Sequence, residues 1–83
     1  MVLVFKHNNG KREVVGYPNK NSEAFEMINS YCSNNGLTIK YFRLSATDHG
    51  NGKIITDFDF GSHTEFFYMA DNQYEKELLR NWD

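Results

Sequence analysis

The chain has 83 residues, of which 16% are aromatic, so it can form one small domain whose large side chains compensate for its short length. Its formal net charge is −2 and its nine Lys and Arg residues are scattered, which argues against nucleic-acid binding through a clustered basic surface. No apolar run is long enough to cross a membrane, and the single cysteine, Cys32, excludes an internal disulfide. We therefore expect one cytoplasmic domain over residues 1–83, with neither nucleic-acid nor membrane partners.

Two β-branched and aromatic runs, at 2–6 and 12–17, predict the first two strands. Asn9 and Gly10 lie between them and favour the positive φ angles of a tight hairpin turn. Pro18 ends the second run, because proline cannot donate a hydrogen bond to a sheet. The chain is therefore predicted to begin with a β-hairpin.

A helix is predicted from about residue 22 to 35, because apolar residues recur there at spacings of three and four. The residues of this stripe are Ala24, Phe25, Ile28, Tyr31 and Cys32. Asn21 or Ser22 can cap the first turn. Gly36 suits the left-handed position that follows a helix, and Leu37 would then fold back onto the last turn.

Three further strands are predicted at 37–45, 53–60 and 63–69, and Gly61 and Ser62 would form a two-residue turn between the last two. That turn would place Asp57 opposite Phe66, with side chains alternating between the two faces of the sheet. The predicted core face carries Ile54, Phe58, Phe60, Phe67 and Met69. The predicted second face carries Ile55, Asp57, Asp59, Thr64, Phe66 and Tyr68.

A second helix is predicted from about Asn72, since Asn72 and Glu75 form a capping-box pattern. Tyr74, Leu78 and Trp82 then recur every four residues as one stripe. The order ββαβββα predicts the α+β class, with both helices on one face of an antiparallel or mixed sheet of about five strands. The sheet would be mixed if the third strand pairs in parallel with the first.

The acidic and aromatic residues between 55 and 69 raise the question of a metal site. Asp57 and Asp59 lie two apart on a strand and point the same way, so with His49 of the preceding loop they could hold a divalent cation. The predicted register places His63 on the opposite face, so it cannot join Asp57 and Asp59. This favours the interpretation that the two aspartates are solvent-exposed side chains near the end of a hairpin. Metal binding or metal-assisted hydrolysis by Asp57, Asp59 and His49 is therefore the alternative function. We predict no catalytic residue and no cofactor.

The leading interpretation rests on apolar surface. If both helices cover one face, then Ile55, Phe66 and Tyr68 form an exposed patch on the other, and such patches mark interaction sites. A shifted register, or a second helix that covers this face, would instead bury them. A third alternative is a small ligand in an aromatic pocket between the sheet and the second helix.

We therefore expect a non-catalytic interaction or regulatory module rather than an enzyme. It would bind itself, as a homodimer, or a protein partner through the aromatic sheet face. The chain resembles the small accessory proteins of phages and mobile elements in its small size, its ten asparagines and its lack of a catalytic motif.

Overall fold

The computed structural model describes residues 1–80 and confirms the predicted α+β class and the order ββαβββα. The strands are β1 (Val2–His7), β2 (Arg12–Gly16), β3 (Arg43–Asp48), β4 (Ile54–Asp59) and β5 (Glu65–Ala70). Helix α1 spans Asn21–Asn34, and a 3₁₀ turn η1 (Asn72–Tyr74) leads into the short helix α2 (Glu75–Leu79). Trp82, which was predicted to continue the stripe of the second helix, lies outside the described residues. No helix within residues 1–80 has the length and apolar character that crossing a membrane requires.

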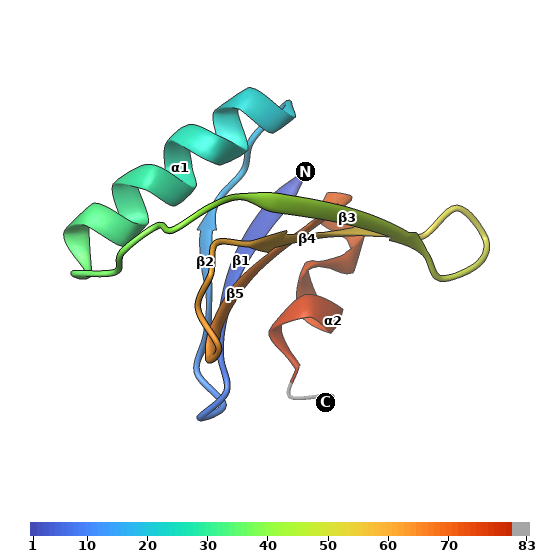
Figure 1. The fold of residues 1–83 in the computed structure, drawn as a ribbon. Coiled ribbons are helices and arrows are strands. Elements are labelled where there is room, and N and C mark those ends of the chain that lie inside the picture. The colour runs from blue at the N-terminus through green and yellow to red at the C-terminus, as the bar shows by residue number, and fades with distance from the viewer. Residues whose placement is uncertain (81–83) are drawn as a thin grey trace.

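The five strands form one antiparallel sheet in the order β2-β1-β5-β4-β3. The first and last strands of the chain are neighbours inside the sheet, and β2 and β3 are its edges (Figure 1). Strand β3 pairs with β4 alone. The sheet is therefore antiparallel throughout, and the parallel pairing of the third strand with the first, which the sequence left open, does not occur.

The two helices lie on opposite sides of the sheet (Figure 1). On one side, α1 packs Ala24, Ile28 and Cys32 against a core that includes Leu3, Phe5, Phe58, Phe60, Phe67 and Met69. On the other side, Leu78 of α2 packs in a cluster with Val2, Val4, Ile55 and Ala70. The prediction that both helices cover one face is wrong, because β1 is apolar on both faces and each face must be covered.

Different hydrogen bonds define the first and the last turn of α1. At the start, Lys20 occupies the cap position without a side-chain hydrogen bond, so neither of the predicted capping residues caps the helix. Instead, the Glu23 carboxylate accepts a hydrogen bond of 2.6 Å from the Asn19 amide. At the other end Gly36 has a φ of 69°, and the Leu37 amide donates to a carbonyl of the last turn at 2.9 Å. The predicted glycine termination is thus confirmed.

The connection between β4 and β5 is longer than predicted, and the register differs accordingly. Asp57 pairs with Tyr68 rather than with Phe66, because residues 60–64 form an irregular loop in place of a two-residue turn. A shift of two residues preserves the alternation of side chains between the two faces, but Ile54, which was predicted on the core face, is 50% exposed. Phe58 and Phe67 pair in the α1 core, as the alternation predicted.

The third strand and the second helix also begin elsewhere than predicted. Strand β3 starts at Arg43, and residues 37–42 are irregular, although the Lys40 amide still donates to the Phe60 carbonyl at 3.0 Å. The cap of η1 is Asp71, whose side chain accepts a hydrogen bond from the Gln73 amide at 3.1 Å. Asp71 therefore takes the capping role that was predicted for Asn72.

Candidate functional site

The three residues of the predicted interface do not form one exposed surface. Ile55 is only 5% exposed and lies in the cluster beneath α2 together with Leu78. Phe66 and Tyr68 are half-buried and line a hollow of approximately 250 Å³. Ile55 is buried because Leu78 of α2 packs in the same cluster, and Tyr68 packs against that cluster, so the expected patch is not exposed as one surface.

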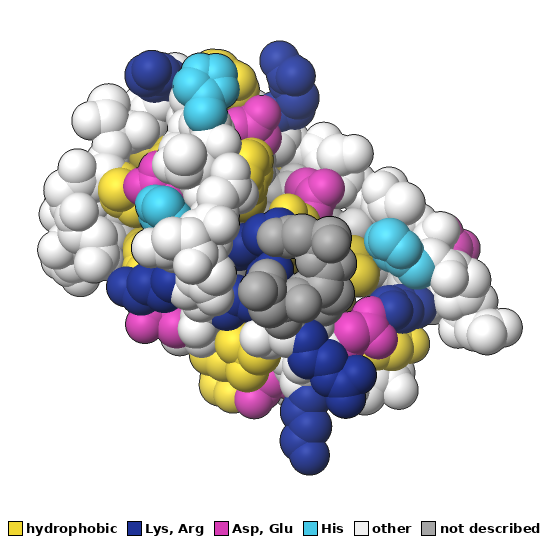
Figure 2. Space-filling model, turned by 90° about the horizontal axis from the view of Figure 1, so that it is seen from below, with side chains coloured by type: hydrophobic (Ala, Val, Ile, Leu, Met, Phe, Trp, Pro, Cys, Tyr) yellow, Lys and Arg dark blue, Asp and Glu magenta, His cyan; other side chains and the backbone are white. Residues whose placement is uncertain are grey.

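Apolar side chains that do reach the surface are spread over the molecule. The exposed large hydrophobic residues are Met1, Tyr17, Tyr41, Leu44 and Ile54. Figure 2 shows the molecule from below, where hydrophobic, basic and acidic side chains of the described residues are interspersed. The described part of this side therefore offers a mixed surface rather than a continuous apolar face.

The predicted metal ligands do not form a metal site in the structure. The Asp59 carboxylate accepts a hydrogen bond of 2.9 Å from the Gly61 amide and thereby fixes the loop after β4. Partial desolvation raises the pKa of Asp57, while the positive charges of His49 and Lys6 oppose that rise. Among residues 1–80 no group of three His, Cys, Asp or Glu side chains is placed to hold a metal ion. The structure therefore does not bring Asp57, Asp59 and His49 together as ligands.

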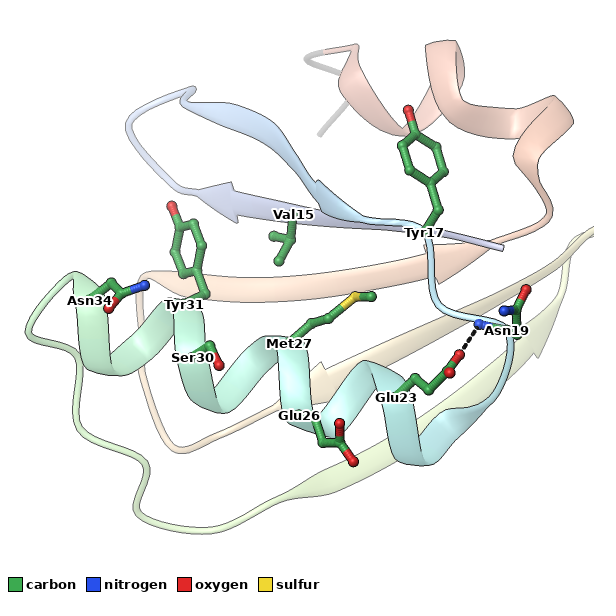
Figure 3. A pocket seen from close by; sticks show the side chains of 9 residues that line it. All are labelled: Val15, Tyr17, Asn19, Glu23, Glu26, Met27, Ser30, Tyr31 and Asn34. Carbon is green, nitrogen blue, oxygen red and sulfur yellow. Dashed lines mark hydrogen bonds between the residues drawn. The ribbon is translucent and has the colours of Figure 1, made fainter.

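A larger hollow, of approximately 530 Å³, lies between α1 and the edge strand β2, and we call it the α1–β2 groove (Figure 3). Alternate residues of β2 and the segment after it supply one wall, and residues three or four apart on α1 supply the other. The nine lining residues are Val15, Tyr17, Asn19, Glu23, Glu26, Met27, Ser30, Tyr31 and Asn34. Its volume falls in the range of binding pockets.

The floor of the groove is apolar and depends on a close approach of strand to helix. Val15 from β2 and Met27 from α1 extend toward each other in the middle of the groove (Figure 3). Next to them, a Cβ atom added at Gly16 would lie 2.7 Å from the Met27 sulfur. The register of β1 and β2 also shifts between Leu3 and Val4, opposite this segment. Glycine at position 16 therefore lets Met27 settle against the strand.

Two tyrosines stand at the two ends of the groove, and each donates a hydrogen bond to a glutamate. The Tyr17 hydroxyl donates to Glu75 at 2.6 Å, and the Tyr31 hydroxyl donates to Glu13. The bond to Glu75 raises the pKa of Tyr17, and burial, together with the bond to Glu13, raises the pKa of Tyr31. Both phenols therefore stay neutral donors at physiological pH, and the rings are held in place.

The charge of the groove is negative. Glu23 and Glu26 line it, and the nine lining residues include no Lys, Arg or His. Glu13 and Glu75 lie behind the two tyrosines, although Lys11 approaches Glu13 to 3.7 Å. An apolar floor with carboxylates along its rim suits a bound side chain or peptide with positive charge.

The groove brings no histidine or thiol next to its hydroxyl groups. Its lining includes no histidine, cysteine or lysine. Cys32, the single thiol, is 1% exposed in the α1 core, and burial raises its pKa, with a smaller contribution from the charge of Glu65.

The chain matches no protein-family model, no curated protein and no solved structure.

Sequence reasoning missed the groove, although signals for it were present. Met27 is an apolar residue of α1 that the predicted stripe did not include, although it lies three residues after Ala24 and four before Tyr31, and Tyr17 is a large aromatic residue just after a strand. In the structure Met27 packs against the α1 core, whereas Tyr17 is 53% exposed. What the sequence could not show is that α1 runs beside β2, which brings these residues together.

Proposed function

We propose that the protein is a small non-catalytic interaction module that binds a segment of another protein in the α1–β2 groove. The observation that carries the proposal is the groove itself, a hollow of approximately 530 Å³ with an apolar floor beside an edge strand. Its volume lies within the range of about 300–1,000 Å³ that is typical of binding pockets. The proposed site thus replaces the aromatic sheet face that the sequence suggested.

The rigidity of the groove supports the same function. Tyr31 packs against Phe5 and Phe67 with ring centroids 4.7 and 5.6 Å away, so one end of the groove is anchored in the α1 core. The other end is held by the bond from Tyr17 to Glu75 of α2. A preformed site loses less conformational entropy on binding than a flexible one.

A peptide library tests the proposal with two matched variants. Ser30 and Asn29 are neighbouring exposed residues of α1, but only Ser30 lines the groove. We expect displayed twelve-residue peptides to be enriched by the unmodified chain and by Asn29→Trp. Ser30→Trp should retain fewer than about one in ten of them, because the indole fills the groove.

Two results would contradict the proposal: no enrichment by the unmodified chain, or equal binding of the selected peptides to both tryptophan variants. Light scattering over a hundredfold range of concentration should be done first. A dimer that is lost in Ser30→Trp and kept in Asn29→Trp would make a second copy of the chain the partner in the groove.

A further inference from the structure

The edge of β2 presents backbone groups beside the groove. The His7 amide donates to the Lys11 carbonyl at 2.8 Å, and hydrogen-bonded pairs alternate with non-bonded pairs along an antiparallel ladder. Counting along the register from this pair, Phe5 and Glu13 form a bonded pair, and Val4 and Val14 form a non-bonded one. The amide and carbonyl of Val14 therefore point away from β1, toward the open edge of the sheet.

The groove could hold one more extended segment between β2 and α1. Val15 of β2 lines the wall opposite α1, and Tyr17 and Asn19 of the segment after β2 extend that wall. The helix wall follows one side of α1 from Glu23 to Asn34. An extended segment laid along β2 would direct every second side chain toward the floor at Met27. Strand addition at a sheet edge beside a groove is a recurring mode of peptide recognition.

The charges on the rim select among extended segments. Glu23 and Glu26 follow the helix wall, and the lining offers no cation to balance them. A segment with Lys or Arg among the side chains that face α1 would place its charges near these carboxylates. An acidic segment would meet repulsion along the same path.

We propose that the occupant of the α1–β2 groove is an extended, basic peptide segment that adds to β2 as a sixth strand. This inference rests on the proposed function, and it adds the conformation and the charge of the partner. Hydrogen bonds to the Val14 backbone hold the segment. Among its side chains that face α1, the apolar ones contact Val15 and Met27, and the basic ones approach Glu23 and Glu26.

The probe for the test is a synthetic ten-residue peptide in which every second residue is in turn Val or Lys and the residues between them are Thr, so that Val and Lys share one side of the extended chain. We call it the Lys–Val peptide, and its counterpart with Glu in place of Lys is the Glu–Val peptide. Titration followed by amide NMR shifts should show changes centred on Val14, Val15 and Met27. Binding of the Lys–Val peptide should weaken about two- to fivefold when Glu26 is changed to Gln. It should weaken further when salt is raised from about 50 to 500 mM. The Glu–Val peptide should bind at least about tenfold more weakly than the Lys–Val peptide.

A compensated variant separates local charge from net charge. Glu26→Gln combined with Asn29→Glu restores the total charge at an exposed α1 position outside the groove lining. We expect the double variant to bind the Lys–Val peptide as weakly as Glu26→Gln alone. Full recovery of binding would mean that net charge, rather than the groove, attracts the peptide, and would overturn the charge part of the inference.

Val14→Pro tests strand addition, since proline on an edge strand removes an outward amide without removing a bond to β1. The loss of one or two backbone hydrogen bonds should weaken binding of the Lys–Val peptide about three- to tenfold. If the proline variant does not fold, the unmodified chain can be tested with a Lys–Val peptide that is N-methylated at alternate residues. This peptide lacks the backbone N–H groups that would donate to β2, so its binding should weaken in the same way.

The two proposals fail in different ways. If library peptides bind in the groove but are helical or acidic, or ignore both Val14→Pro and N-methylation, the strand-addition inference is wrong and the proposed function stands. If no peptide binds in the groove at all, both are wrong.

Discussion

Two glycines of this chain share a backbone conformation but occupy different surroundings. Gly61 and Gly50 have φ angles of 94° and 97°, which side-chain-bearing residues rarely adopt. Nothing lies within 4 Å of a Cβ added at Gly50, whereas one at Gly61 would lie 2.8 Å from the Lys40 Cβ and 3.2 Å from the Tyr41 ring. Gly61 therefore allows both a turn and the close approach of another segment.

We predict that Gly50→Ala lowers the free energy of unfolding by about 1 kcal/mol, from backbone strain alone. Gly61→Ala should cost about 1–3 kcal/mol more, because the segment at Lys40 and Tyr41 must also move. Urea unfolding of the two variants measures the difference. Equal losses would show that residues 37–42 do not rest on the β4–β5 loop as described.

The single thiol offers a measure of local opening. Cys32 is buried, and its raised pKa reduces the thiolate that alkylating reagents attack. We predict that iodoacetamide at pH 8 labels Cys32 at least about 100-fold more slowly in the native protein than in urea, since α1 must detach first. Ile28→Val, one helical turn away, should speed native labelling. Labelling at a similar rate in both conditions would contradict the packing of α1.

Some residue roles could be foreseen from the sequence and others could not. The end of α1 at Gly36 and Leu37 was predicted correctly. The left-handed conformation of Gly36 and the hydrogen bond of the Leu37 amide depend only on the local backbone. The cap at Asp71 was missed because Asn72 has an equally suitable side chain. Local chemistry identifies a set of residues that can cap, and the path of the chain selects one of them.

At the scale of the elements, β4 and β5 show what a pattern of alternation determines. The sequence correctly predicted that Phe58 of β4 and Phe67 of β5 face the same core, since both side chains must be buried. Their register was wrong by two residues, because the Asp59 carboxylate and the side chains of Ser62 and Thr64 close a longer loop. A shift of two residues keeps the faces, so hydrophobic pattern alone cannot detect it.

The groove arises between elements, and for this reason sequence periodicity did not reveal it. Periodicity assigned α1 and β2 correctly but carried no information on which strand lies beside the helix. The edge position of β2 follows from β1 pairing with the last strand, β5, far away in the chain. Long-range pairings of this kind depend on the burial of the whole molecule rather than on any local signal.

At the scale of the whole molecule, the two cores are joined through the central strands. Strand β1 gives Leu3 and Phe5 to the α1 core and Val2 and Val4 to the α2 cluster. Strand β5 is likewise shared between the two cores, through Phe67 on one side and Ala70 on the other. Neither core can lose its strands without exposing the other. The chain should therefore unfold as one cooperative unit.

We predict that one core substitution on either side lowers the same single transition. Ile28 and Leu78 are both fully buried, in the α1 core and the α2 cluster respectively. Ile28→Val should cost about 0.5–1.5 kcal/mol and Leu78→Ala about 2–4 kcal/mol, whereas Asn29→Ala, exposed on α1, should change stability by less than about 0.5 kcal/mol. Urea unfolding followed by far-ultraviolet circular dichroism and by tyrosine absorbance should give coincident curves for every variant. Two separate transitions in Leu78→Ala would show that α2 packs as an independent unit, and that the groove end held by Tyr17 and Glu75 can open without the rest of the fold.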